Sequence, residues 1–253
     1  MGALKMGHVT GKTIVITGAS KGIGAATARV LSAMGAHVVL AARSTHALKE
    51  LAKDTGGTAI PCDVRDFAQV QALMDTAGDV DVLINNAGLI DPIARLADSD
   101  STAWGNVVDV NIKGVYHGLR AALPGMIKRG SGTIINISSG AATSALEGWS
   151  HYCATKAAVL SLTRVADKEA RAAGVRVMGL SPGTVATDMQ RDIAASGINP
   201  VSQLAWDAHI PPEWVGQTIA VLIGPEGQNW RGQDFSLKSN QGRTIAGLPS
   251  LPT

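Results

Sequence analysis

The sequence predicts an α/β fold in which a parallel β-sheet carries helices on both faces. Short runs rich in β-branched residues alternate with longer helix-length segments, the pattern expected of successive βαβ units with right-handed crossovers. Several runs are continuously apolar instead of alternating, which is typical of strands covered on both sides. They predict a doubly wound, seven-stranded sheet with strands at residues 13–16, 37–40, 58–60, 80–84, 133–137, 175–178 and, more weakly, 234–237.

Helix-length segments between these runs supply the two outer layers of a three-layer arrangement. No internal repeat, low-complexity tract or linker divides them, so residues 1–253 are predicted to form one domain. Glycine and proline make the stretch from about 188 to 212 less regular. The predicted helices span residues 22–34, 45–54, 67–77, 101–129 and 150–173.

The composition suits a protein with a large apolar core. Hydrophobic residues make up 45% of the 253 residues and charged residues 17%. The formal net charge is +2 without a basic stripe, so nothing supports binding to nucleic acid or to an anionic membrane. No apolar run reaches the roughly 18–20 residues that a membrane helix needs. Residues 1–10 lack the apolar core of a signal peptide, and a cytoplasmic location is therefore expected.

Cysteine usage excludes two further classes of protein. Cys62 and Cys153 are too few for a disulfide framework, and neither has the spacing of metal ligands, so no metal site is predicted. Cys153 is expected to be a small buried side chain and not a nucleophile.

A glycine-rich turn joins the first predicted strand to the first predicted helix. Glycines at 18, 22 and 24 allow a tight turn, a close approach of the backbone to a pyrophosphate, and close packing of the helix on the sheet. The opening of the helix offers unpaired N–H groups to phosphates. In this position the motif predicts a Rossmann-type dinucleotide site; a purely structural turn is the alternative. The predicted phosphate contacts are Gly18, Ser20, Lys21, Gly22, Ile23 and Gly24.

Tyr152 and Lys156 form a second motif, one turn apart in the predicted helix 150–173. Their side chains therefore share a face of that helix. A phenol has an ordinary pKa of about 10, which is high for proton exchange near neutrality, and a nearby ammonium is expected to lower it. The pair predicts an acid/base centre, with an ordinary helix surface as the alternative.

The two motifs resemble the short-chain dehydrogenase/reductase family, and the resemblance covers nearly the whole chain. It implies a three-layer Rossmann fold and hydride transfer between a nicotinamide cofactor and a carbonyl or secondary alcohol. Tyr152 would be the general acid/base, Lys156 would tune it and reach the nicotinamide ribose, and Ser139 would stabilise the substrate oxygen. Asn111 would anchor a water of the proton relay. The resemblance also implies a homotetramer.

Two of these assignments leave an alternative open. The adjacent Ser138 leaves the register of the catalytic serine undecided between two positions. For Asn111, a structural amide is the alternative to a role in the proton relay.

The second predicted strand indicates which nicotinamide cofactor is used. Ala42 stands where an acidic residue would bind the ribose 2′-hydroxyl of NAD, and Arg43 follows it. With Lys21 in the glycine turn, two cations and no carboxylate favour a 2′-phosphate. NADP(H) is therefore predicted over NAD(H); a solvated Arg43 is the alternative.

The remaining cofactor contacts follow from the resemblance and stand after predicted strands. Asp63 and Val64 are expected at the adenine, although an aspartate here also suits a turn or a helix cap. The segment after the fourth strand would pass beside the cofactor, and the segment after the sixth would hold the nicotinamide carboxamide. These residues are Asn86, Ala87, Gly88, Pro182, Gly183, Val185 and Thr187.

Two stretches near the C-terminus bear on the substrate pocket and on differences between this sequence and the family. Residues 188–212 are expected to cover the substrate, with an apolar pocket or lid built from Met189, Ile193, Leu204, Trp206 and Ile210 unless these only pack. Many family members carry a Gly-Gly pair shortly after the last strand, and residues 232–242 of this chain lack one. The tail 242–253 is expected to wrap a neighbour or to be mobile.

Two other functions fit the same fold. One is a non-catalytic NADP-binding sensor or interaction module; the other is an NADP-linked epimerase or dehydratase. The sequence does not identify the small-molecule substrate.

Overall fold

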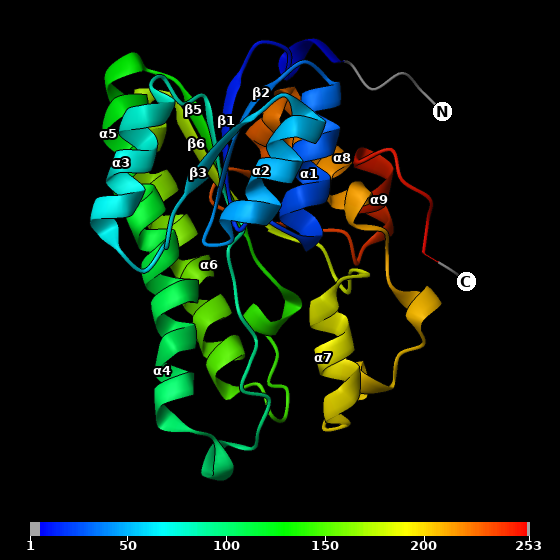
Figure 1. Cartoon of the computed structure of the whole chain (residues 1–253). Helices are drawn as coiled ribbons and strands as arrows, with labels where there is room; N and C mark the ends of the chain where they lie inside the picture. Colours follow the sequence, from blue (N-terminus) through cyan, green and yellow to red (C-terminus); the bar gives the residue numbers. More distant parts are fainter. Residues whose placement is uncertain (1–5, 252–253) are drawn as a thin grey trace.

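A computed structural model describes residues 6–251, and its centre is a seven-stranded, entirely parallel sheet in the order β3-β2-β1-β4-β5-β6-β7 (Figure 1). The order reverses between β1 and β4, so the chain winds outward in both directions, as predicted. The strands are β1 Thr13–Thr17, β2 His37–Ala42, β3 Thr58–Pro61, β4 Val82–Asn85, β5 Gly132–Ile137, β6 Val175–Ser181 and β7 Asp234–Ser236.

Helices cover both faces of the sheet and complete the predicted three layers (Figure 1). In β1, Ile14 and Ile16 point into one apolar core while Val15 points into the other, because side chains alternate along a strand. The first core is covered by α1 Gly22–Ala33, α2 Thr45–Thr55, α8 Pro212–Ile223 and α9 Asn240–Ile245. The second is covered by α3 Phe67–Ala77, α5 Gly114–Arg129 and α6 Ser150–Ala170.

Local signals in the sequence set several boundaries of these elements. The Asp66 carboxylate accepts hydrogen bonds from the amides of Ala68 and Gln69 and begins α3. Gly56, in the left-handed conformation with φ 65°, ends α2.

The predicted helix 101–129 is wrong in one respect. It is divided into α4 Ser101–Val108 and α5 by a π-helical turn at Asp109–Lys113. A π turn inserts a residue without changing composition, so apolar periodicity does not reveal it. The inserted turn carries Asn111, one of the predicted site residues.

The C-terminal third contains more structure than expected. The helix α7 Asp188–Ser196 opens the irregular segment and lies beyond the carboxyl ends of the strands (Figure 1). The described part of the tail packs on its own chain, because Ala246 and Leu248 join the first core and the Arg243 Nε donates to the Leu237 carbonyl. Residues 252–253 lie outside the described residues, as do residues 1–5, on which much of the signal-peptide prediction rests.

No helix within residues 6–251 is long and apolar enough to cross a membrane. Over the same residues, no group of three or more His, Cys, Asp or Glu side chains is placed to hold a metal ion.

Candidate active site

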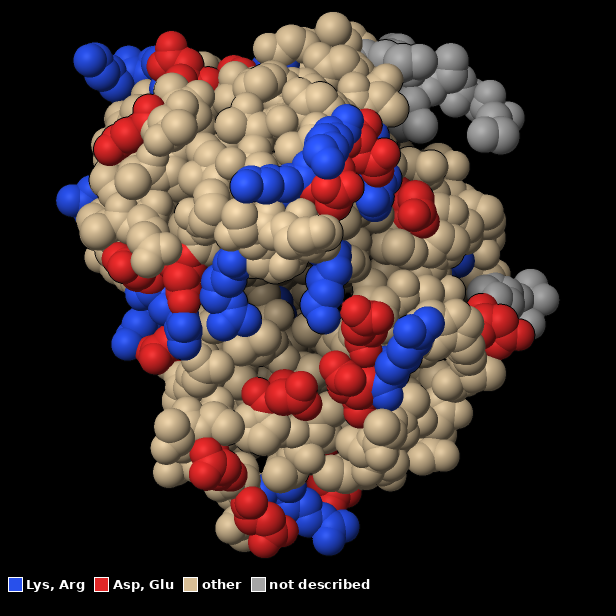
Figure 2. Space-filling view, in the orientation of Figure 1, with Lys and Arg blue, Asp and Glu red and all other residues tan. Residues whose placement is uncertain are grey.

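A cleft of about 1010 Å³ opens at the carboxyl ends of the strands, around the point where the strand order reverses. Ligands of open parallel sheets bind at this place because the loops after neighbouring strands diverge there. Figure 2 shows a hollow in this face, with basic side chains above it and acidic ones below. The cleft is the natural candidate for a cofactor and a substrate together.

Almost all of the predicted site residues line this one cleft, although they come from seven separate segments of the chain. The exceptions are Gly24 and Asn111, which lie behind its wall. The lining includes Gly18, Ser20, Lys21, Gly22, Ile23, Arg43, Asp63, Val64, Asn86, Ala87, Gly88, Ser139, Tyr152, Lys156, Pro182, Gly183, Val185 and Thr187.

The glycine turn has the shape of a phosphate cradle. Gly18 has φ 63°, and a Cβ on it would lie 2.7 Å from the Cα of Ala87. Lys21 precedes α1 in an extended conformation without a side-chain cap, which leaves the first-turn N–H groups of α1 to a ligand. Gly22 and Ile23 carry two of these groups and line the cleft.

Gly24 brings α1 close to the turn. A Cβ there would lie 2.5 Å from the carbonyl oxygen of Gly18 and 2.9 Å from the Cα of Ala19, both of which are backbone atoms. We expect Gly24→Ala to destabilise the fold by about 1–3 kcal/mol, because the backbone of the turn must shift. Urea unfolding checks this. Gly105→Ala in α4, whose Cβ would meet nothing within 4 Å, is the control and should be neutral or stabilising. Equal stability of the two variants would contradict the account.

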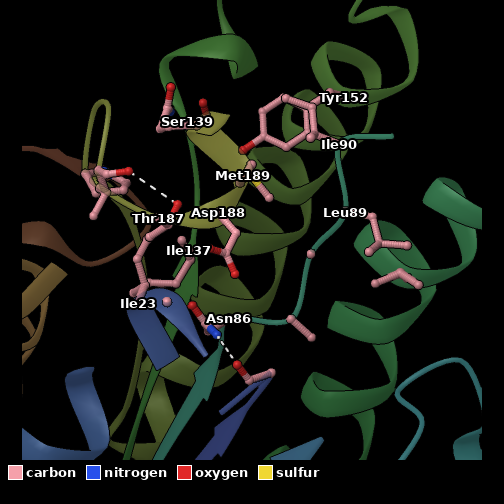
Figure 3. Close-up of a pocket in the computed structure, with 18 of the residues that line it drawn as sticks. Ile23, Asn86, Leu89, Ile90, Ile137, Ser139, Tyr152, Thr187, Asp188 and Met189 are labelled. Atoms are coloured by element: carbon pink, nitrogen blue, oxygen red, sulfur yellow. Dashed lines mark hydrogen bonds between the residues drawn. The ribbon is translucent and has the colours of Figure 1, made fainter. Parts of the chain in front are cut away.

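Asn86 braces this turn from the neighbouring strand. Its Nδ2 donates to the carbonyl oxygens of Thr17, at 2.8 Å, and Gly18, at 3.1 Å (Figure 3). The Thr17 hydroxyl in turn accepts from the amides of Asn86 and Ala87. The amide group of Asn86 therefore supports the cradle, while the residue also lines the cleft.

The two predicted cations lie at the same end of the cleft. Lys21 pairs with Asp188 at 3.4 Å in an exposed contact, and Arg43 forms no ion pair with any described residue. Asp63 forms a turn by accepting from the Arg65 amide, and the Arg65 guanidinium lowers the pKa of its carboxyl. The cap of α3 is Asp66, so the turn alternative for Asp63 holds and the cap alternative does not.

Tyr152 and Lys156 stand at the other end, on the first turns of α6. The Lys156 Nζ lies 5.5 Å from the centroid of the Tyr152 ring and donates to the Ile137 carbonyl oxygen at 2.7 Å. The Tyr152 hydroxyl points towards the Ser139 side of the cleft (Figure 3). Ser139 is partly exposed there, whereas Ser138 is 2% exposed, which favours Ser139 as the serine that meets a substrate.

The expected lowering of the tyrosine pKa is wrong for this structure. Burial raises the pKa of Tyr152 to about 12, and the hydrogen bond with Ser139 opposes this rise only in part. Burial also lowers the pKa of Lys156 to about 8, with Asp234 opposing. Desolvation sets the direction of both shifts, and the Lys156 ammonium, whose Nζ lies 5.5 Å from the centre of the Tyr152 ring, is not among the groups that lower the pKa of Tyr152. At neutral pH, Tyr152 therefore carries a proton that it can donate.

Asn111 holds two elements together behind the cleft. Its Oδ1 accepts from the Leu89 amide at 2.8 Å, and its Nδ2 donates to the Leu89 carbonyl at 2.9 Å and to the Thr155 hydroxyl at 3.1 Å. These contacts fix the segment after β4 against α6 and favour the structural-amide alternative for the side chain. Its part in a proton relay stays a prediction.

A model of short chain dehydrogenases matches residues 12–197, which include the glycine turn, Ser139 and the Tyr152–Lys156 pair. The chain belongs to the short chain dehydrogenase family. An uncharacterized oxidoreductase of Staphylococcus saprophyticus is 38% identical over 227 residues, covering 86% of this chain and 92% of its own. This short chain dehydrogenase is thus an oxidoreductase.

Two solved structures resemble most of the chain. The actinorhodin polyketide ketoreductase with NADPH has a TM-score of 0.81 at 27% identity and covers 90% of this chain and 95% of its own. The 3-ketoacyl-(acyl-carrier-protein) reductase of Brucella melitensis complexed with NADH has a TM-score of 0.81 at 26% identity, over 90% of this chain and 97% of its own.

The dehydrogenase also has an apolar wall beside Tyr152 that the sequence only partly indicated. Met189 and Ile193 line the cleft as expected, whereas Leu204 and Trp206 are 42% and 49% exposed and do not. Ile210 belongs to the core under α8, so the packing alternative applies to it. The rest of the wall was missed because its members lie on loops or in a short 3₁₀ helix, where no periodicity marks them: Leu89, Ile90, Leu146, Trp149 and Val201.

Both cysteines are free, and neither is one of the predicted catalytic residues. Burial raises the pKa of the Cys62 thiol to about 11, which keeps it protonated and unreactive. Cys153 is partly buried and packs against the apolar cluster around Trp149, consistent with the packing role expected of it.

Proposed function

We propose that this dehydrogenase is an NADP(H)-dependent oxidoreductase that transfers hydride between the nicotinamide and a carbonyl or secondary alcohol, with Tyr152 as general acid/base. The observation that carries the proposal is the shared cleft. The cradle at Gly18 and Ile23 and the acid/base pair at Tyr152 and Lys156 open into the same space from its two ends.

The cleft suits a dinucleotide in shape and in charge. Side chains at Gly18 or Gly24 would fill the turn, and the uncapped start of α1 offers N–H groups to a pyrophosphate. Lys21 and Arg43 suit a ribose 2′-phosphate, since the nearby Asp63 carboxylate is engaged by Arg65. One similar structure holds NADPH and another NADH, so the preference for NADP(H) rests on the residues of this chain.

The residues at the reacting end have separable roles in reduction. A bound nicotinamide supplies the hydride. Tyr152 donates its phenolic proton to the substrate oxygen as negative charge develops there, and the Ser139 hydroxyl stabilises that charge. Lys156, as an ammonium, stabilises the phenolate that remains and donates to ribose hydroxyls. Oxidation reverses each proton movement.

This mechanism predicts how reduction depends on pH. The reaction needs Tyr152 protonated and Lys156 charged, and the lower of the two pKa values, about 8, belongs to Lys156. The kcat/KM for reduction should therefore be level below pH 8 and fall above it, as the ammonium loses its proton. A pH profile from 6 to 10 measures this. A rate that rises through pH 8 would contradict the proposed roles.

The apolar wall supports a neutral, apolar carbonyl as substrate. Ile90, Trp149 and Met189 surround the approach to the Tyr152 hydroxyl, and α7 begins the segment 188–212 that would cover the substrate. We further propose a cytoplasmic homotetramer in which the chain is one domain. Tyr116, Ile127 and Val165 are exposed apolar side chains on α5 and α6 that could meet another subunit.

NADPH consumption over a panel of ketones, from apolar to anionic, tests the function. We expect stoichiometric formation of alcohol, fastest with apolar ketones. Tight NADPH binding without turnover would support the sensor alternative. Turnover without loss of NADPH absorbance would support the epimerase or dehydratase alternative.

A further inference from the structure

Asp234 is half-buried at the sheet, and one oxygen of its carboxylate is shielded from solvent. Asp234 begins β7, and its Oδ2 accepts a hydrogen bond of 2.6 Å from the Ser181 hydroxyl. Its Oδ1 is shielded from solvent and has no hydrogen-bond partner among the described residues. A carboxylate oxygen that is buried and unpaired is costly, so it requires an explanation in function or in a neighbouring charge.

The missing side chain at Gly179 leaves room for this carboxylate to extend across the sheet. Gly179, in β6, is paired in register with Asp234 on one side and with Asn136 of β5 on the other. A Cβ on Gly179 would lie 2.5 Å from the Asp234 Oδ1. The carboxylate therefore occupies the space that a side chain of β6 would fill, and it reaches from β7 towards β5.

Lys156 approaches the same region from α6. The residue Lys156 is 6% exposed, and its Nζ donates to the Ile137 carbonyl oxygen at the end of β5. Asp234 is the charge that opposes the effect of burial on Lys156, and Lys156 and Arg164, both of α6, are the cations that act on Asp234. The Ser138 hydroxyl is near enough to favour the charged carboxylate but has no hydrogen bond to it.

Partial burial strengthens the coupling between these two charges. Attraction between opposite charges grows as the surroundings become less polar, so a carboxylate at this depth acts more strongly than one at the surface. Burial raises the pKa of Asp234 above that of an ordinary aspartate, while Ser181 and Lys156 favour its charged form. Each group thus offsets part of the desolvation of the other.

We propose that Asp234 is a positioning residue for catalysis: lying over Gly179, it is the partly buried counter-charge that keeps Lys156 an ammonium. The inference rests on the proposed function, because it assigns Asp234 a role only through Lys156. It also accounts for a glycine at position 179, which leaves room for the carboxylate.

Asp234→Asn tests the inference through the alkaline limb of the kcat/KM profile for reduction. Without the carboxylate, the pKa of Lys156 should fall. The alkaline limb should then move to a lower pH by roughly one unit, the low end of the shift that a nearby opposite charge produces. The thermal unfolding midpoint should stay at or above that of the parent, because a poorly paired, partly buried charge is removed. Asp75→Asn, an equal charge change at an exposed position of α3 that does not line the cleft, should leave the limb in place.

The outcomes separate this inference from the proposed function. A limb that moves in Asp234→Asn and not in Asp75→Asn supports it. An unmoved limb overturns it, whether or not the rate falls, since a merely structural aspartate would lower rate and stability at every pH. If Asp234→Asn does not fold, Asp234→Ser, which is smaller and uncharged, carries the same test. Activity retained in Tyr152→Phe would instead overturn the proposed function.

Discussion

Tyr152→Phe should lower kcat for reduction by about 10²–10⁴-fold, the range for loss of a positioned general acid. The change removes one oxygen atom and leaves the ring, which packs edge-on against Trp149 at 5.6 Å. The phosphate cradle lies at the other end of the cleft, so the affinity for NADPH should change little. Steady-state kinetics with the best ketone, together with fluorescence titration of NADPH, measure both quantities.

The chain supplies a matched control for this variant. Tyr116, the second of its two tyrosines, lies on α5, is 49% exposed and does not line the cleft. Tyr116→Phe removes the same atom and should leave kcat and NADPH affinity unchanged. A Tyr152→Phe enzyme with near-parental kcat would remove the tyrosine from proton transfer.

Lys21→Gln combined with Arg43→Gln should lower kcat/KM for NADPH by at least about 100-fold and leave the value for NADH within a few fold. Hydrogen bonds to a charged group contribute about 1.5–3 kcal/mol each, and about 1.4 kcal/mol is a factor of ten. Both cations line the adenosine end of the cleft, and the neighbouring Arg65 guanidinium is engaged by Asp63. Kinetics with each cofactor at saturating ketone measure the ratio.

Arg29→Gln is the control for the change in charge. Arg29 is exposed on α1, pairs with Asp54 at 2.8 Å and does not line the cleft. Its loss should alter both cofactors equally and slightly. If the double variant lowered kcat/KM for NADPH and NADH by the same factor, Lys21 and Arg43 would not select the 2′-phosphate.

The fold could be predicted because its determinants are local and repeated. Apolar runs such as that of β1 and turn signals such as Gly56 are read from a few neighbouring residues. The π turn at Asp109–Lys113 was missed because tertiary contact decides it: a Cβ on Gly114 would lie 2.7 Å from Val64 Cγ2, across the layer. The helix α7 follows a loop whose conformation the sequence pattern does not specify.

The parts of the candidate site that belong to sequence motifs could be predicted. The parts that depend on how distant segments pack could not. The glycine turn and the Tyr152–Lys156 pair have fixed spacings, and the structure brings them to one cleft. Burial leaves no pattern of residue spacing in the sequence, so the raised pKa of Tyr152 could not be predicted from it. The same holds for Asp234, which is distant from Lys156 in sequence and reaches its side of the sheet only over Gly179.

Transfer of a label tests the central claim most directly. NADPH carrying deuterium at the transferring position of the nicotinamide is incubated with the enzyme and an apolar ketone, and the alcohol is examined by mass spectrometry and NMR. The account predicts one deuterium on the carbinol carbon of each product molecule, and none formed at a comparable rate by Tyr152→Phe. Alcohol without the label, or labelled alcohol formed at the parental rate by Tyr152→Phe, would contradict it.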